Sequence, residues 1–282
     1  MPHVTVGMPT YKRAEYLKKT IPLVLGQTFG NFELIVCDDA SPDETESVVR
    51  AFKDPRIRYH RNPSNLNIPR NLNRILELAR GERIVMLHDH DIFHPTLLEK
   101  MVRFLDDHPE AGCAQPGINW VDPDGGNLQS CLLDWEGVMN GHAWLEKILT
   151  QDSFSCPFSA CGMVPRKVYE KTGFIYDIRF GFLSDVDLWY RIALDFDVGY
   201  IREPLITCLR RDKDHMYGGV DWRMIRWVVD ICRVNLGRLF GGDPARLRLA
   251  ERTWRRQRAL YFLTCALSDI AGRIRRICGK QS

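Results

Sequence analysis

RIVMLHDHD, at residues 83–91, joins a short apolar run directly to two carboxylates and two imidazoles. Four or five apolar residues bounded by charge predict a buried strand, and a strand of an open α/β sheet presents its last residues at the carboxyl edge, where ligands bind. Asp89 and Asp91 are two residues apart, so on an extended chain their side chains leave on the same side. The stretch therefore predicts paired oxygen donors for a divalent cation that bridges phosphates, with a solvated polar turn as the alternative.

Two other predicted strands end in polar residues in the same way. Residues 3–8 (HVTVGM) stop at residues 9–13 (PTYKR), and residues 32–37 (FELIVC) stop at Asp38 and Asp39. Helical patterns separate the strands, and a parallel, mostly doubly wound α/β sheet follows from this alternation. In such a sheet all three polar clusters lie along one edge, so we expect them to form one site.

The helical patterns have recognisable limits. The first helix begins after residue 13, and the others cover residues 43–52, 69–79 and 95–107. A short strand lies at residues 57–60. Ser41 can cap the helix over 43–52, and Glu44 completes a capping box. We therefore expect that helix to begin directly after Ser41.

The second half of the chain predicts mixed topology. Short β-like segments (112–116, 162–164) and one helix (141–149) indicate a small antiparallel element that crosses the sheet edge. A further helix begins at Ser184 or Asp185, where carboxylates also favour the helix dipole. Two closing strands, 200–203 and 205–209, precede a charged loop at 210–219 whose glycine pair suggests a mobile lid.

Composition limits the class of protein. The 282 residues are 45% apolar and 27% charged, with a net charge of +3, which is typical of a soluble globular protein with a full core. The nine cysteines include no C-x-x-C pair, so we expect reduced thiols in the cytoplasm rather than a disulfide framework or a zinc site. No signal peptide pattern opens the chain, and no apolar run reaches the ~20 residues of a membrane span.

The basic charge is concentrated in the last residues. Residues 246–282 carry nine Arg and one Lys against two acidic residues, so the rest of the chain is mildly acidic. Apolar residues between Leu260 and Ile277 recur at spacings of three and four, which predicts a C-terminal helical tail. Three interpretations remain open: a helix packed on the domain, a homodimer contact, or a basic amphipathic helix in peripheral contact with the cytoplasmic face of a membrane.

Five motifs, in order and spacing, resemble a family 2 glycosyltransferase with the GT-A fold over roughly residues 1–215. They are Pro9–Arg13, Asp38–Ser41, Asn65–Asn71, Asp89–Asp91 and Ser184–Arg191. The resemblance implies a Rossmann-like, mostly parallel central sheet flanked by helices. It also implies a GT-A domain over 1–220, with a nucleotide-binding half (1–110) and an acceptor-binding half (111–220), followed by a helical appendage over 221–282.

The resemblance further implies residue roles in nucleotide binding. Asp39 would accept a hydrogen bond from a pyrimidine N3–H, and His90 stands where the family usually has a ribose-binding Asp. The planar guanidinium groups of Arg13 and Arg70 suit the nucleotide and its pyrophosphate. The segment that would line the base comprises Pro9, Thr10 and Tyr11.

For the metal and the chemistry, the resemblance implies that Asp91 binds Mn²⁺ or Mg²⁺. Asp89 would assist directly or through water, and His215 would complete the site, with a solvated surface histidine as the alternative. Asp185 would be the catalytic base that takes the proton of an acceptor hydroxyl. Ser184 replaces the family's usual Glu, so Asp187 remains a lesser candidate for the base.

These features together predict an inverting, metal-dependent glycosyltransferase. The donor would be a UDP- or dTDP-sugar and the acceptor a hydroxyl of a glycan or lipid-linked molecule, in surface polysaccharide synthesis. The alternative is a catalytically inactive partner subunit that binds nucleotide-sugar or glycan, which His90 and Ser184 favour. Nucleic acid is not an expected partner, because apolar positions dominate the periodic face of the basic tail.

Overall fold

One mixed sheet organises the chain, and its strands follow the order β3-β2-β1-β4-β9-β6-β10-β5, with β7 on β6 and β8 on β10. The computed structural model describes residues 2–122, 126, 128–150, 161–173, 176–209, 222–253 and 255. The strands are β1 (Val4–Thr10), β2 (Phe32–Asp38), β3 (Ile57–Arg61), β4 (Arg83–Met86), β5 (Ile92–Phe93), β6 (Ala111–Val121), β7 (Leu128–Cys131), β8 (Gly137–Met139), β9 (Met163–Pro165) and β10 (Asp197–Leu209). The helices are α1 (Ala14–Leu25), α2 (Thr45–Ala51), α3 (Ile68–Leu78), α4 (Leu97–Asp107), α5 (Gly141–Thr150), α6 (Arg166–Thr172), η1 (Ile178–Leu183), α7 (Ser184–Asp195) and α8 (Trp222–Phe240).

The predicted parallel sheet and its small antiparallel element are both present. β3, β2, β1 and β4 pair in parallel, and β10 pairs in parallel with β6. Between these groups β9 runs antiparallel to both β4 and β6. Because the parallel strands point the same way, the carboxyl ends of β1, β2 and β4 lie at one edge, as the sequence predicts.

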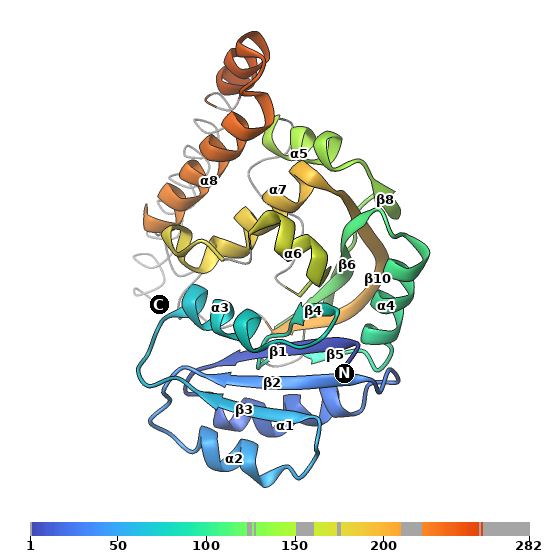
Figure 1. Cartoon of the computed structure of the whole chain (residues 1–282), viewed down its shortest axis with the longest axis vertical. Helices are drawn as coiled ribbons and strands as arrows, with labels where there is room; N and C mark the ends of the chain where they lie inside the picture. The colour runs from blue at the N-terminus through green and yellow to red at the C-terminus, as the bar shows by residue number, and fades with distance from the viewer. Residues whose placement is uncertain are drawn as a thin grey trace, which may run out of the picture.

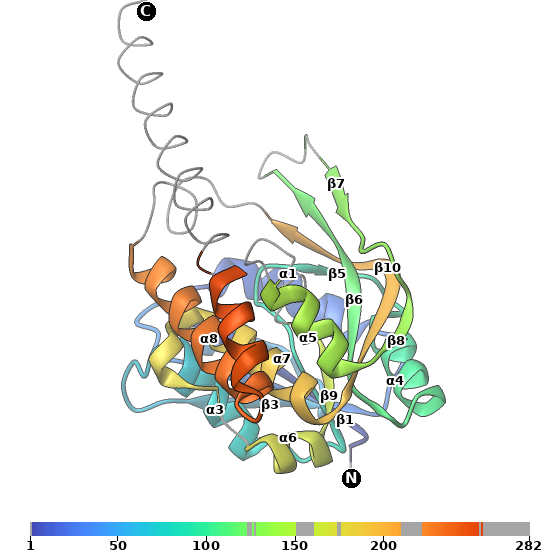
Figure 2. The ribbon, with the colours of Figure 1, turned by 90° about the horizontal axis from the view of Figure 1, so that it is seen from above.

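Alternation along the strands builds a separate core on each face of the sheet. In β2, Leu34 and Val36 belong to the cluster that includes α1, α2 and α4, whereas Ile35 and Cys37 belong to the cluster with α3, α5, α7 and α8. Successive side chains of a strand point to opposite faces, and every residue of β2 is buried, so both faces of this strand are covered. Figures 1 and 2 show the helices covering the two faces.

Gly7 sets the distance between β1 and α3. A Cβ atom at this position would lie 2.5 Å from Cγ2 of Ile75 and 2.6 Å from Sδ of Met86. Both contacts are shorter than real Cβ atoms tolerate, so only glycine lets α3 pack this closely. The helix that carries Arg70 is thereby held against the central strand through Ile75.

Two expected elements differ in the structure. The helix over 43–52 begins at Thr45, and Ser41 does not cap it; its hydroxyl accepts a 2.9 Å hydrogen bond from the backbone N–H of Lys12. The expected capping box is therefore wrong, because the Ser41 side chain joins two loops instead. The two closing strands are one strand, β10, in which Pro204 lies at a register irregularity.

The C-terminal region begins with α8, which contacts α5, α7 and η1. Ile231, Cys232, Leu236 and Phe240 are buried in the same cluster as α3 and α7. Residues 244–253 are also helical. The 210–219 loop and the apolar stripe of residues 260–277 lie outside the described residues. Within the described part of the chain, no helix has the length and apolar character of a membrane span.

Candidate active site

The ends of the parallel strands are tied together by hydrogen bonds at the predicted edge. The Thr10 hydroxyl at the end of β1 donates to Oδ2 of Asp89, after β4, at 2.7 Å. The backbone N–H of Asp39, after β2, donates to the Thr10 carbonyl at 2.9 Å. The three polar clusters predicted from the sequence therefore form one continuous group.

The segment with Asp89 and Asp91 is a turn rather than an extended chain. β4 ends at Met86, residues 89–90 form a turn, and Asp91 immediately precedes β5. The expectation that the two carboxylates share one side of a strand is therefore wrong, because it requires extended backbone. Both carboxylate oxygens of Asp89 are engaged, one by Thr10 and the other by Nδ1 of His90 at 2.9 Å.

Asp91 is buried and only half satisfied. The residue is 1% exposed, and its Oδ2 lies 3.1 Å from Nδ1 of His88. Its Oδ1 has no hydrogen-bond partner, and a ring nitrogen of His90 lies 3.8 Å away. Burial acts to raise the pKa of Asp91, but the hydrogen bond and charge of His88 outweigh it and hold the pKa below its ordinary value.

A group of possible metal ligands converges on Asp91. Ligand atoms of His88, Asp91 and Cys161 all lie within 4.8 Å of one another. The buried Oδ1 without a partner fits a cation at this point, since buried polar atoms in native proteins are almost always satisfied. Asp89 lies outside the group, and His215 lies outside the described residues, so both remain predictions as ligands.

The sequence alone does not single out His88 and Cys161 as possible ligands. His88 directly follows the apolar run, which is a usable signal. Cys161 carries none in the sequence, because its approach to His88 depends on the pairing of β9 with β4. Seventy positions separate Cys161 from Asp91, and no local periodicity connects them.

Asp185 lies in the first turn of α7, near enough to this edge for the charge of His88 to act on it. Its Oδ1 accepts a 2.9 Å hydrogen bond from the backbone N–H of Val186. Burial raises the pKa of the Asp185 carboxyl to about 6, although the charge of His88 acts in the opposite direction. The charge of Asp185 also acts on Cys161 and Tyr176, so this carboxylate and the ligand group share one environment.

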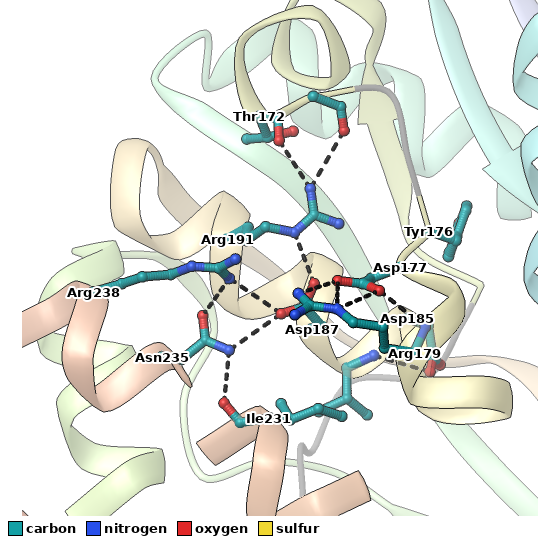
Figure 3. A network of polar contacts seen from close by, with 12 residues as sticks. Thr172, Tyr176, Asp177, Arg179, Asp185, Asp187, Arg191, Ile231, Asn235 and Arg238 are labelled. Carbon is teal, nitrogen blue, oxygen red and sulfur yellow. Dashed lines mark hydrogen bonds and ion pairs between the residues drawn. The ribbon is translucent and has the colours of Figure 1, made fainter. Parts of the chain in front are cut away.

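Asp187, two residues later, has a different environment (Figure 3). It is fully buried, and its Oδ2 accepts a 2.8 Å hydrogen bond from Nε of Arg191. Its Oδ1 accepts from Arg238 at 3.2 Å and from Asn235 at 3.3 Å. Because Asn235 and Arg238 belong to α8, this carboxylate joins α7 to α8.

Asp39 organises the loop that leads to α3. It is 4% exposed, and its Oδ1 accepts hydrogen bonds from Asn62 at 2.9 Å and from the Leu66 backbone at 2.8 Å. Its Oδ2 accepts one hydrogen bond, from the Asn67 backbone at 3.0 Å. A carboxylate oxygen has two acceptor positions, so Oδ2 has capacity for a further donor.

The other residues expected to bind nucleotide lie around this edge. Pro9 and Thr10 end β1, and Tyr11, directly after it, is 40% exposed. The Arg13 guanidinium lies 5.2 Å from the centre of the Tyr16 ring, whose edge meets His90. Arg70 is exposed in the first turn of α3.

Unusual backbone conformations gather at the same edge. Among the described residues, the non-glycine residues with positive φ are Lys12 (56°), Ala40 (62°) and Asn67 (68°). They follow β1, follow β2 and precede α3, respectively. Such conformations cost free energy and are concentrated at functional sites, so their clustering marks this edge independently of the side chains.

A mostly parallel α/β sheet places its ligand site in the loops at the carboxyl edge of its strands. The model of the family described as "Glycosyl transferase family 2" matches residues 5–173. The chain belongs to this family, and it is a glycosyltransferase.

Curated relatives and solved structures agree. The protein described as "Putative glycosyltransferase EpsE" of Bacillus subtilis is 28% identical over 76% of this chain and 74% of its own length. An uncharacterized glycosyltransferase of Methanocaldococcus jannaschii is 28% identical over 76% of this chain and 73% of its own. Crystal structures of S. aureus TarS residues 1–349 with UDP-GlcNAc and with UDP superpose with TM-scores of 0.68 and 0.66, at 16% and 14% identity. They cover 84% of this chain and 67% and 66% of the crystallised TarS chain of residues 1–349, and they establish a GT-A-like fold.

Proposed function

We propose that the protein is an inverting, metal-dependent transferase that uses a UDP-sugar, or a dTDP-sugar, as donor. The acceptor is a hydroxyl of a glycan or lipid-linked molecule, in surface polysaccharide synthesis. The observation that carries this proposal is the proximity of Asp185 to His88, which follows β4 and whose charge acts on the Asp185 carboxyl. The UDP and UDP-GlcNAc complexes of TarS support the choice of donor.

Asp185 acts as the general base in a single displacement. Its carboxylate takes the proton of the acceptor hydroxyl while that oxygen forms a bond to C1 of the donor sugar. The bond between C1 and the diphosphate oxygen breaks at the same time, and the electron pair leaves with the nucleoside diphosphate. Attack from the face opposite the leaving group inverts the anomeric centre. With a pKa of about 6, the base is ionised at neutral pH and still accepts a proton readily.

Asp187 is a poor candidate for the same role. Its oxygens already accept hydrogen bonds from Arg191, Arg238 and Asn235, and two of these partners are guanidinium groups in ion pairs with it. The side chain is also fully buried, so no acceptor hydroxyl reaches it. We assign Asp187 to positioning α7 and Asp185 to the chemistry.

The nucleotide lies across the ends of β1 and β2 in this proposal. Oδ2 of Asp39 accepts the N3–H of the pyrimidine, and the Tyr11 ring, next to Pro9 and Thr10, stacks on the base. Arg13 and Arg70 supply positive charge to the pyrophosphate. His90 stands near the ribose, where its ring offers a hydrogen bond without a fixed charge.

The residues around Asp91 fit a divalent cation, as its buried, unpartnered Oδ1 indicates. When bound, Mn²⁺ or Mg²⁺ would neutralise charge on the departing diphosphate. Asp91 is the principal ligand in this proposal, and Asp89 and His215 are the predicted additional ligands.

Figure 3 shows the two carboxylates at the start of α7. Asp185 accepts a hydrogen bond from the Val186 backbone, whereas Asp187 is bound by Arg191, Asn235 and Arg238.

The domain limits inferred from the sequence remain part of the proposal. Residues 1–110 bind the nucleotide, residues 111–220 bind the acceptor, and residues 221–282 form a helical appendage. The appendage is the segment through which we propose contact with a second copy or with the cytoplasmic face of a membrane.

A panel of nucleotide-sugars tests the function. Thermal unfolding is measured with each donor in the presence of Mn²⁺ or Mg²⁺, since a ligand that binds the folded state raises the midpoint. Release of UDP from the stabilising donor is then followed with and without acceptor glycans. A raised midpoint with release supports a transferase, whereas a raised midpoint without release under any condition identifies the inactive binding subunit. No stabilisation by any UDP- or dTDP-sugar contradicts the proposal.

A further inference from the structure

We propose that the cation beside Asp91 is bound by nitrogen and sulfur as well as by oxygen, through His88, Asp91 and Cys161. This donor set selects Zn²⁺ or Co²⁺ over the Mg²⁺ of the proposed function, and it puts His88 and Cys161 beside Asp91 in place of Asp89 and His215. The inference rests on the proposed function, because it names the metal chemistry of the same donor site. It predicts a protein thiolate bound directly to the metal.

The sheet register brings the three residues together. β4 and β9 are antiparallel, with Val85 opposite Met163, so continuing the register places Cys161 opposite the residue before His88. The backbone N–H of His88 hydrogen-bonds the Cys161 sulfur. The turn at 89–90 then returns the chain, and Asp91 Oδ2 lies 3.1 Å from the His88 ring. The three ligands therefore lie just outside the paired strands: Cys161 precedes β9, and His88 and Asp91 flank the turn after β4.

The buried oxygen of Asp91 is an independent indication of a ligand. Oδ1 has no hydrogen-bond partner in a residue that is 1% exposed, whereas Oδ2 is close to His88 and to Sγ of Cys208 at 3.7 Å. An unsatisfied buried carboxylate oxygen is costly, and a cation removes that cost. The side chain of His88 is 38% exposed, which provides a route from solvent.

The spacing of the ligand atoms suits a small cation. Zn²⁺ binds nitrogen and oxygen at about 2.0–2.2 Å and sulfur at about 2.3 Å, so tetrahedral ligand atoms lie roughly 3.3–3.8 Å apart. The atoms here lie within 4.8 Å of one another, and rotation of the side chains closes the difference. Three protein ligands leave a fourth position for water or a phosphate oxygen, as in metal sites that act on substrates.

Ligand chemistry determines the selectivity. Mg²⁺ prefers an octahedral set of oxygens and keeps several waters, and neither sulfur nor imidazole belongs to that set. Thiolate and imidazole suit Zn²⁺ and its spectroscopic substitute Co²⁺. Binding breaks the S–H bond of Cys161, forms a metal–sulfur bond and releases the proton to solvent. Two negative ligands then balance the charge of the cation at a buried position.

Co²⁺ absorption tests this directly on the full chain. A Co²⁺–thiolate bond produces a charge-transfer band in the near ultraviolet, which oxygen and nitrogen ligands do not produce. We expect this band to saturate at one equivalent of Co²⁺, to disappear on addition of Zn²⁺, and to persist in excess Mg²⁺. Absence of the band in the unmodified protein overturns the proposal.

Variants assign the sulfur among the nine cysteines. Cys161→Ser should abolish the band and weaken Zn²⁺ binding by more than about tenfold. Cys131→Ser, at an exposed thiol, and Cys113→Ser, at a buried thiol in β6, are the matched controls; both should retain the band. His88→Gln should weaken binding while leaving a thiolate signal at higher Co²⁺. Circular dichroism confirms that each variant is folded, and a band that survives Cys161→Ser overturns the proposal.

The outcome is separable from that of the proposed function. If the protein lacks the Co²⁺ band but transfers sugar with Mg²⁺, the proposed thiolate ligand is wrong and the proposed function stands. A saturable band in a protein that binds no nucleotide-sugar retains the metal site and sinks the function.

Discussion

The hydroxyl of Thr10 donates a 2.7 Å hydrogen bond to the carboxylate of Asp89, and this bond ties the end of β1 to the turn after β4. Both residues are buried, at 3% and 6% exposure. Asp89 is held further by its carbonyl, which accepts from the Thr20 hydroxyl at 2.9 Å. The turn that presents His90 and Asp91 is therefore anchored from two elements of the chain.

Thr10→Val tests that anchor. Valine keeps the shape but leaves a carboxylate oxygen unsatisfied, so we expect the free energy of unfolding to fall by about 1–3 kcal/mol. The affinity for UDP should fall as well, because the turn is released. Urea unfolding and calorimetric UDP binding measure the two effects. Thr28→Val, at an exposed hydroxyl, is the control, and equal losses in both variants contradict the prediction.

Asp185→Asn removes the proposed base with little change in shape. We expect kcat to fall by about 10²–10⁴-fold, the usual range for a general base, while the dissociation constant for UDP stays within a factor of about two. Steady-state kinetics and calorimetry separate these quantities. Full turnover by this variant would remove Asp185 from its role.

The pH profile should report the same carboxyl. Because burial raises the pKa of Asp185 to about 6, the ionised base is lost below that pH and kcat/KM should fall tenfold per pH unit. The folded protein also holds this proton more tightly than the unfolded chain does. The free energy of unfolding should therefore decrease as pH rises from the ordinary pKa of 3.8 to about 6.

Two measurements check that profile. Activity is followed from pH 5 to pH 8, and thermal unfolding from pH 3.8 to pH 8, so that loss of fold is not mistaken for loss of the base. The decrease in stability between pH 3.8 and about 6 should be smaller in Asp185→Asn, since asparagine does not titrate. A profile that is flat down to about pH 5 contradicts the assignment.

Asp187→Asn should act on stability rather than on chemistry. It leaves Arg191 and Arg238 without their carboxylate partner, and breaking a buried ion pair costs about 3–5 kcal/mol. Urea unfolding provides the measurement. Asp230→Asn removes an exposed pair with Arg226 on α8 and should cost no more than about 0.5 kcal/mol. Similar values for the two variants would show that the Asp187 network contributes little.

Gly7→Ala tests the packing of α3 on β1. The added methyl group meets Ile75 and Met86 at 2.5 and 2.6 Å, so we expect a loss of about 1–3 kcal/mol from overpacking and weaker nucleotide binding as α3 shifts. Gly30→Ala, where a Cβ atom meets nothing within 4 Å, is the matched control. An unchanged unfolding midpoint for Gly7→Ala would show that the contact relaxes freely.

Most of the first half of the fold was predictable because each element carries its own periodicity. β1, β2, β3 and β4 lie within one or two residues of the segments expected. Errors arose where tertiary contacts overrode local signals. Ser41 bonds the Lys12 backbone rather than capping a helix, and β10 continues through Pro204 because β6 accommodates the irregularity.

The candidate site was predictable to the extent that strand order determines it. A parallel sheet brings the residues after β1, β2 and β4 to one edge, whatever the loops do. The approach of Cys161 to His88 depends on β9 inserting antiparallel beside β4, and no spacing in the sequence encodes that partner. The hydrogen bonds from Asn235 and Arg238 of α8 to Asp187 could not be predicted for the same reason.

Lys12, Ala40 and Asn67 hold left-handed backbone without the freedom of glycine, and Asp39 and Ser41 bond directly to these loops. The strained loops are therefore shaped before any ligand arrives. Association with a nucleotide then loses little chain entropy to ordering, so more of the contact energy remains as affinity. Glycine at these three positions would relieve the strain. It would also give the free loops more conformations, so that ordering them on binding would cost more entropy.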